Sequence, residues 1–194
     1  MTASTLQLVW PNRAGLPQYQ AALERGWSPD NVRGAKAAAE ELQRVAADPD
    51  AFVAAQVDRE AKGSPISLPD GSTVRRIPGY RRWLWDGEFC GVISLRWQTG
   101  TAELPPHCLG HIGYAVVPWK RRRGYATAAL RLTLREARAE GLPHVIITTQ
   151  PENLASQKVI LANGGEFLGR FPMPQGYAEG EEFYYRIVLP GNPG

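Results

Sequence analysis

The segment VVPWKRRRGYAT, residues 116–127, joins an apolar strand-like stretch to a strongly helical one near the middle of the chain. A buried strand that ends in a cationic turn and opens into a helix is suited to binding phosphate. The first turn of a helix leaves backbone N–H groups unpaired, and the helix dipole favours an anion there. Gly124 lets the backbone approach a ligand closely because it has no Cβ, and the arginines supply forked donors that match phosphate oxygens. The segment therefore predicts a phosphate-binding strand–turn–helix unit.

The composition indicates a soluble globular protein. The chain has 194 residues, of which 43% are hydrophobic and 21% charged, and this length suits one domain with a sizeable core. No apolar run approaches the ~20 residues that cross a bilayer, so we expect no membrane association. The N-terminus lacks the basic start and apolar region of a secretory signal, and two cysteines are too few for a disulfide framework or a thiolate zinc site. We expect a cytoplasmic protein without a metal.

The net charge of +3 is compatible with an anionic ligand but is weak evidence for nucleic acid. The cationic cluster from Lys120 to Arg123 is short, ends at Gly124 and is followed by an alanine-rich helix. A nucleic-acid surface normally continues over a whole face, with aromatic residues between the basic ones. We therefore expect no nucleic-acid partner.

The order of the predicted elements indicates a mixed α/β sheet in a single domain, residues 1–194. The N-terminal part, residues 1–79, holds a strand at 6–10, helices at 16–26 and 31–47 with Asp30 as N-cap, a short helix after 52 and a long loop from 62. Residues 80–190 begin with a hairpin that turns at Asp86-Gly87. A strand at 110–117, a helix from about 122 to 140, a helix at 151–163 and two last strands at 166–171 and 183–189 follow. The run at 144–149 predicts a strand of the buried, parallel kind.

Two motifs resemble the GNAT superfamily, the acyl-coenzyme A-dependent N-acetyltransferases. Residues 121–126 fit the superfamily's Gln/Arg-x-x-Gly-x-Gly/Ala signature. The segment 153–160, followed by Asn163-Gly164-Gly165, is similar to its second signature and lies at the expected separation. The stretch 110–116 and the Leu-Pro-x-Gly-like loop at 68–71 are similar to a less-characterised group of predicted GNAT enzymes. The resemblance is specific over about residues 80–170 and looser before them.

The resemblance implies a mixed sheet whose central parallel strands splay apart, with acetyl-CoA in the gap as cosubstrate. Its pantetheine arm would pair with the strand edge at Val116 and Val117, as in β-augmentation, and its pyrophosphate would meet the backbone N–H groups near the start of the helix. Asn153 and Ser156 resemble positions that touch the pantetheine or the thiol, although an N-cap explains Asn153 equally well. The cofactor-binding residues expected on this basis are Val116, Val117, Arg121, Arg122, Arg123, Gly124, Tyr125, Ala126, Thr127, Asn153 and Ser156.

The catalytic residues are less well defined. Acetyl transfer to an amine requires a neutral amine, a base for its proton and, for the leaving thiolate, an acid. His111 is a candidate because histidine titrates in the useful range, but a core histidine explains it as well. Many members of the family carry a glutamate base one position earlier, where this chain has Gly110. Many also carry a tyrosine seven residues after the position of Asn153, where this chain has Ile160, so Ser156 is a candidate replacement.

We expect the acceptor to be a small-molecule or peptide amine. Its pocket would lie between the N-terminal helices, the loops at 63–79 and 98–109, and the last strands. Several side chains there have two explanations each, one in the pocket and one in the core or in solvent: Trp83, Trp85, Trp97, Glu103, His107, Glu179, Glu181, Glu182 and Tyr184. Cys90 and Cys108 are expected in the core or a loop rather than as nucleophiles.

The resemblance favours an N-acetyltransferase that uses acetyl-CoA and transfers the acetyl group directly in a ternary complex. Because the usual glutamate and tyrosine are missing, a non-catalytic acyl-CoA sensor stays open, and so does an acyltransferase with a longer acyl donor. The acceptor, the acyl chain and the oligomeric state, with a homodimer among the options, are not decided by the sequence.

Overall fold

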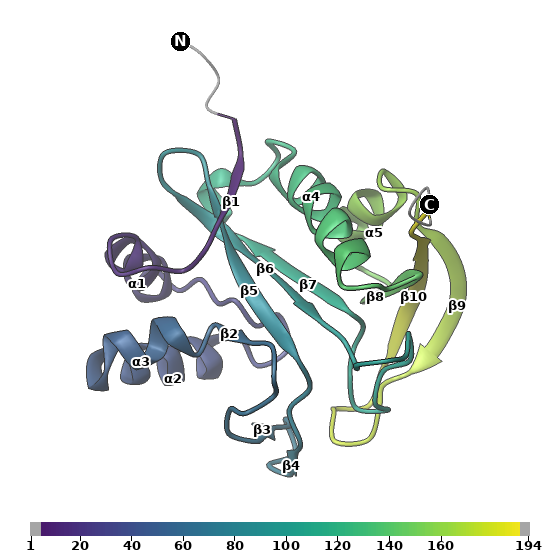
Figure 1. Cartoon of the computed structure of the whole chain (residues 1–194), viewed down its shortest axis with the longest axis horizontal. Coiled ribbons are helices and arrows are strands. Elements are labelled where there is room, and N and C mark those ends of the chain that lie inside the picture. The colour runs from purple at the N-terminus through teal and green to yellow at the C-terminus, as the bar shows by residue number, and fades with distance from the viewer. Residues whose placement is uncertain (1–4, 191–194) are drawn as a thin grey trace.

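In the computed structural model, which describes residues 5–190, the chain forms two main β-sheets with helices packed on them (Figure 1). The first sheet has the order β1-β5-β6-β7, with β2 also pairing on β5, and the second has the order β8-β10-β9. The strands of these sheets are β1 (Gln7–Val9), β2 (Val57–Asp58), β5 (Gly79–Trp85), β6 (Phe89–Arg96), β7 (Ile112–Val116), β8 (His144–Thr149), β9 (Glu166–Pro172) and β10 (Glu181–Val188). The helices are α1 (Leu16–Glu24), α2 (Gly34–Ala47), α3 (Pro49–Ala54), α4 (Tyr125–Ala139) and α5 (Leu154–Leu161), with a short 3-10 helix at Pro118–Lys120.

Two hydrophobic cores form on opposite faces of the first sheet, because neighbouring residues of a strand point to opposite sides. Trp83 and Val92 pack with the N-terminal helices in one core, whereas Leu84 and Ile93 pack with α4, α5 and the second sheet in the other. Figure 1 shows α1, α2 and α3 on one side of the sheet and α4 and α5 on the other. Tyr19 stacks on Trp83 in the first core, with 5.2 Å between the ring centroids. Both faces of the sheet are therefore covered.

The hairpin and the strand–turn–helix unit confirm the sequence prediction, with one shift. The chain turns at Asp86-Gly87, between β5 and β6, and Gly87 has a φ of 104°. The long helix begins at Tyr125 rather than near 122. Arg122 and Gly124 have φ values of 61° and 75°, and this left-handed backbone cannot continue a right-handed helix.

Two N-terminal helices begin at positions other than those predicted. Asp30 accepts hydrogen bonds from the backbone N–H groups of Val32 and Arg33, both at 2.8 Å, so it caps a preceding turn. Helix α2 then begins at Gly34. Helix α3 begins at residue 49 rather than near 52, because the side chain of Asp48 accepts N–H groups of its first turn.

The second sheet corrects one prediction. The strand at 144–149 has the predicted bounds, but it is antiparallel to β10, with Phe183 opposite Thr149, and it alternates buried with half-buried residues. Strands β7 and β8 do not pair with each other as parallel strands. Within residues 5–190, an isolated antiparallel bridge joins Gly110, which precedes β7, to Ile147 of β8. An apolar run fits either arrangement, because the half-buried face of this strand also carries an isoleucine, Ile146.

The predicted long loop contains a small hairpin. Strand β3 (Ile66–Ser67) pairs with β4 (Thr73–Val74) around the expected turn at 68–71. Leu68 is buried, and the N–H of Asp70 donates to the carbonyl of Gly176 in the β9–β10 loop at 3.1 Å. This segment therefore packs against the end of the second sheet.

Replacing Gly91 by alanine should destabilise the protein strongly. Gly91 has a φ of 145°, and a Cβ there would lie 2.2 Å from the carbonyl oxygen of Ala115 on the paired strand. We expect Gly91→Ala to lower the free energy of unfolding by about 3 kcal/mol or more, measured by urea denaturation. Gly100→Ala is the control, since Gly100 has a φ of 81° with open space around it, and should cost about 1 kcal/mol. Equal losses would contradict this account of β6 and β7.

Candidate active site

Strand β7 has one paired edge and one open edge. It pairs with β6 along its length, and no strand pairs with its other edge within residues 5–190. The carbonyls of Tyr114 and Val116 point to the open edge, where they accept hydrogen bonds from the side chains of Asn31 and Arg121, both at 3.2 Å. Backbone groups at such an edge can pair with an extended ligand.

Val117 does not belong to this open edge. Its N–H donates to the carbonyl of Cys90 at 3.0 Å, its carbonyl accepts from the N–H of Lys120 at 3.0 Å, and its side chain is fully buried. Alternate residues of a strand share an edge, so the open edge offers Val116 and Tyr114 rather than Val116 and Val117.

The first turn of α4 offers unpaired backbone donors. Its first intrahelical bond runs from the N–H of Ala128 to the carbonyl of Gly124, at 3.0 Å, so the amides of Tyr125, Ala126 and Thr127 have no acceptor within the helix. No side chain caps this end, and no acidic residue lies in its first turn. A Cβ on Gly124 would meet nothing within 4 Å. The helix N-terminus therefore has the donors and the space that an anion needs.

The arginine loop, residues 121–124, provides the positive charge beside this helix end. Its three arginines are exposed. Lys120 is different, because it is buried and its ammonium lies 3.0 Å from both carboxylate oxygens of Asp86 and 2.9 Å from Glu88. The cationic cluster noted in the sequence is therefore three arginines at the surface, with the lysine neutralised by the β5–β6 turn.

Two hydroxyl groups meet beside the open edge. The hydroxyl oxygens of Tyr114 on β7 and Ser156 on α5 are 2.8 Å apart. Burial raises the pKa of Tyr114 to about 12, although the bond to Ser156 lowers it, so the phenol is protonated at neutral pH. Sequence reasoning identified Ser156 but missed Tyr114. The signal that could have found it is its place on the strand two residues before Val116.

His111 is fully buried where the chain approaches β8. Its Nδ1 accepts a hydrogen bond from the N–H of Ile146 at 2.9 Å. Burial, with His144 nearby, lowers its pKa to about 4, so the ring is neutral at pH 7. A catalytic role for His111 stays a prediction. Gly110, where many family members carry a glutamate, has a φ of 94° and would place a Cβ 2.8 Å from the Ile146 carbonyl, so it leaves no room for a side chain.

Several other candidates have structural explanations. Asn153 caps α5, since its Oδ1 accepts the N–H of Ser156 at 3.1 Å, and a ligand contact by it stays a prediction. Trp83 and Trp97 are buried core residues. Burial, followed by the neighbouring Asp86, raises the pKa of Cys90 to about 12. This cysteine is therefore a thiol rather than a reactive thiolate at neutral pH.

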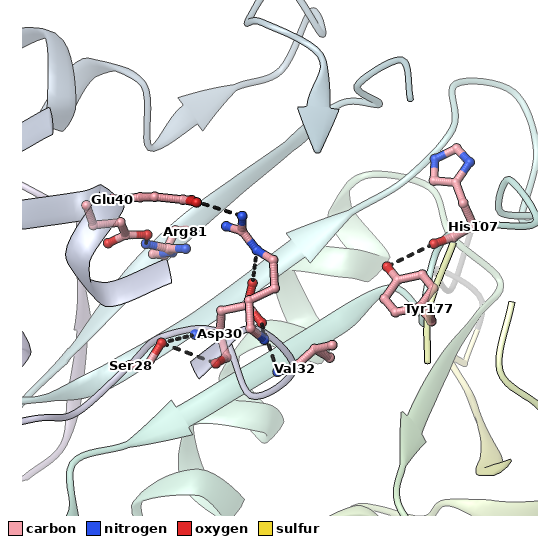
Figure 2. A network of polar contacts seen from close by, with 9 residues as sticks. Ser28, Asp30, Val32, Glu40, Arg81, His107 and Tyr177 are labelled. Carbon is pink, nitrogen blue, oxygen red and sulfur yellow. Dashed lines mark hydrogen bonds and ion pairs between the residues drawn. The ribbon is translucent and has the colours of Figure 1, made fainter. Parts of the chain in front are cut away.

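Figure 2 shows two groups of polar contacts, one around Asp30 and the other between Tyr177 and His107. In the α1–α2 segment, Arg33 is held by Asp30 at 3.1 Å and Glu40 at 2.9 Å. In the β9–β10 loop, the hydroxyl of Tyr177 donates to the carbonyl of His107 at 3.2 Å. Burial raises the pKa of Tyr177, and the charges of Asp30 and Arg33 also act on it. That these two loops line the acceptor pocket stays a prediction.

Glu182 on β10 is a buried carboxylate. It is 5% exposed and makes no ion pair in the part of the chain that the structure describes. Burial raises its pKa, the side chain of Thr148 lowers it through a hydrogen bond, and the charge of Glu152 raises it. The neighbouring Glu179 and Glu181 are exposed. A solvated turn therefore accounts for those two residues but not for Glu182.

Within residues 5–190, no group of three or more His, Cys, Asp or Glu side chains is arranged to hold a metal ion. No helix in the same range has the length and apolar character needed to cross a bilayer.

A protein-family model described as "Acetyltransferase (GNAT) domain" matches residues 31–166. The match covers more than half of the chain, including the arginine loop and α5, and the protein therefore belongs to the GNAT acetyltransferase family. A search of curated protein sequences finds no match.

Solved structures with the same fold are also acetyltransferases. The ribosomal L7/L12 α-N-protein acetyltransferase RimL in complex with coenzyme A is 14% identical, with 97% of each chain covered and a TM-score of 0.61. The microcin C7 self-immunity acetyltransferase MccE in complex with acetyl-CoA and AMP is 12% identical, with 97% of this chain and 98% of that chain covered and a TM-score of 0.57. A GNAT-family acetyltransferase from Bacillus anthracis is 17% identical, with 97% and 98% covered and a TM-score of 0.59. At these identities the likeness shows the fold.

Proposed function

We propose that this protein is an N-acetyltransferase that moves an acetyl group from acetyl-CoA to a primary amine by direct attack in a ternary complex. The observation that carries the proposal is the open edge of β7, which leads into the uncapped N-terminus of α4 beside three exposed arginines. An extended arm can pair with such an edge, and a pyrophosphate can bind such a helix end. RimL and MccE, which share the fold, are known in complex with coenzyme A and acetyl-CoA.

The residues that would hold acetyl-CoA fit its chemistry. The backbone at Tyr114 and Val116 would bond to the amide groups of the pantetheine arm, because each carbonyl has a second lone pair beside the one that Asn31 or Arg121 occupies. The free amides of residues 125–127 and the arginine loop would bind the pyrophosphate. Acetyl-CoA supplies an acetyl group activated as a thioester.

The pair of Tyr114 and Ser156 would supply the acid. As the C–S bond breaks, the tyrosyl hydroxyl donates its proton to the departing thiolate, either directly or through Ser156. Ser156 alone was the candidate from the sequence, and the tyrosine beside it provides the phenol that is missing at Ile160. Because its pKa is about 12, Tyr114 holds this proton throughout the neutral range.

Glu182 would supply the base on the acceptor side. The amine forms the new C–N bond with the acetyl carbon, and its proton passes to the Glu182 carboxylate directly or through water. A carboxylate buried without a cation also attracts the ammonium form of the acceptor before reaction. The base cannot come from the usual position, because Gly110 has no room for a side chain.

A non-catalytic acyl-CoA sensor is the competing function, and the crowded Gly110 and the fully buried Ile160 favour it. Calorimetry with acetyl-CoA, followed by a panel of amines assayed for release of free thiol, separates the two. Binding with thiol release on at least one amine is the result we expect. Binding without release on any amine would support the sensor, and faster reaction with propionyl- or succinyl-CoA would show a longer acyl donor.

Placing a carboxylate at the helix end should weaken coenzyme A binding. Gly124→Glu puts a negative charge where the pyrophosphate would bind, and we expect roughly a 10²-fold loss of affinity by calorimetry. Gly141→Glu is the control at the other end of α4, because Gly141 has a similar φ of 85° and equally open space. It should bind coenzyme A as the wild type does. Equal affinity in the two variants would remove the proposed pyrophosphate site.

Removing the Tyr114 hydroxyl should slow the reaction without weakening donor binding. Tyr114→Phe keeps the ring in place, so we expect kcat to fall by at least about 10²-fold while the affinity for acetyl-CoA is kept. Ser156→Ala should lower kcat as well, and the double variant should be little worse than the worse single one, since the two hydroxyls act as a unit. Full kcat in Tyr114→Phe would exclude it as the acid.

Replacing Glu182 by glutamine should remove the base. We expect Glu182→Gln to lower kcat/KM for the best amine by roughly 10²- to 10⁴-fold. A carboxyl group with a raised pKa acts as a base only above that pKa, so wild-type activity should fall as the pH is lowered through it, and the variant should lose this dependence. Glu181→Gln is the control, because Glu181 is exposed and paired with Arg170 at 3.1 Å. Identical pH profiles for the two variants would contradict the assignment.

A further inference from the structure

One carboxylate holds both ends of the arginine loop. Asp86, in the turn between β5 and β6, lies 3.0 Å from the ammonium of Lys120 through each of its oxygens. The hydroxyl of Tyr125 donates to the same carboxylate at 2.5 Å. Lys120 directly precedes the loop and Tyr125 directly follows it. The Asp86 side chain, from a different part of the sheet, therefore holds both the residue before the loop and the residue after it.

The contact is buried and permanently charged. The Asp86 side chain is 6% exposed and that of Lys120 is 11% exposed. Burial by itself raises the pKa of Asp86, but the hydrogen bonds from Tyr125 and Lys120 outweigh it and hold the pKa at about 2. The carboxylate is therefore ionised over the whole physiological range, and removing it would leave the Lys120 ammonium buried with only the exposed Glu88 as a partner.

The loop between these points has an unfavourable backbone. Arg122 has a φ of 61° and Gly124 one of 75°, and a left-handed conformation is disfavoured for a residue with a side chain such as arginine. Such backbone persists where the surrounding structure determines it. Residues of this kind next to a helix start turn successive N–H groups toward one point, an arrangement that binds anions.

We propose that Asp86 is a positioning residue for the cosubstrate: by bonding to Lys120 and Tyr125 it keeps the arginine loop in its anion-binding conformation before acetyl-CoA arrives. This inference rests on the proposed function. A preformed loop binds the pyrophosphate without a separate ordering cost. The Oδ1 of Asp86 also accepts the N–H of Glu88 within its own turn, at 3.2 Å, so the carboxylate joins this turn to both ends of the loop.

The test compares two acetyl donors in the Asp86→Asn variant. Acetyl-CoA carries the pyrophosphate, whereas S-acetyl-N-acetylcysteamine has the thioester and a short amide arm without it. We expect KM for acetyl-CoA to rise about 10- to 100-fold, with kcat/KM for the short donor unchanged. If Asp86 only stabilised the fold, kcat/KM would change by the same factor for both donors, and that result would overturn the proposal.

Glu41→Gln is a matched control for the loss of a buried charge. Glu41 also lies between a cation and a tyrosine hydroxyl, namely Arg81 at 3.0 Å and Tyr19. It joins α2 to α1 and β5 instead of the arginine loop. This variant should lose stability in thermal unfolding, yet keep the wild-type ratio of kcat/KM for the two donors. A changed donor ratio in Glu41→Gln would show that the ratio reports stability only, and would overturn the proposal.

A second variant covers the case in which Asp86→Asn fails to fold. Tyr125→Phe removes one hydrogen bond and keeps the ion pair, so it should fold and raise KM for acetyl-CoA alone by a smaller factor. An unchanged KM would again overturn the proposal. A wild-type protein with no affinity for coenzyme A would overturn the proposed function and this inference together, whereas normal wild-type transfer with equal effects on both donors would overturn this inference alone.

Discussion

The site depends on one close approach between the two sheets. Gly110 lies so near β8 that a Cβ would stand 2.8 Å from the Ile146 carbonyl, and its φ of 94° turns the chain at that point. From there β7 pairs with β6 and β8 pairs with β10, so neither strand completes the other's edge. The open edge of β7 is a direct consequence. A residue with a side chain at position 110 would push the sheets apart and also displace the buried His111 next to it.

The buried carboxylates of this protein differ in whether they have a cation. Asp86 and Glu41 each have one, and both tie segments of the chain together. Glu182, which is 5% exposed, has none in the described residues. An unpaired buried carboxylate destabilises the folded state, and such groups are concentrated at functional sites. The contrast with the paired carboxylates is the reason for assigning chemistry to Glu182 and positioning to Asp86.

The sequence predicted the parts of the site whose signals are local. The strand–turn–helix unit and the hairpin at Asp86-Gly87 follow from turn and helix-start preferences over a few residues, and both are confirmed. Lys120 looked like the arginines beside it, because its burial depends on a hairpin more than thirty residues away. Tyr114 was missed for the same reason, and Glu182 was named only together with the exposed Glu179 and Glu181, so the sequence did not single it out. The neighbours of Tyr114 and Glu182, namely Ser156 and Thr148, are brought to them only by long-range packing, which no local pattern encodes.

The difference between local signals and long-range packing also distinguishes the proposed sites for the two substrates. The proposed donor site is nearly continuous in the chain, from β7 to the first turn of α4. The proposed acceptor side is assembled from the α1–α2 loop, the loop before β7 and the last strands. The two sides meet at Tyr114. Its carbonyl is bonded to Asn31 of the α1–α2 loop, and its hydroxyl is bonded to Ser156 of α5. A ligand that pairs with the β7 edge would share or replace the Asn31 contact, so the proposed donor site is in contact with one wall of the proposed acceptor site.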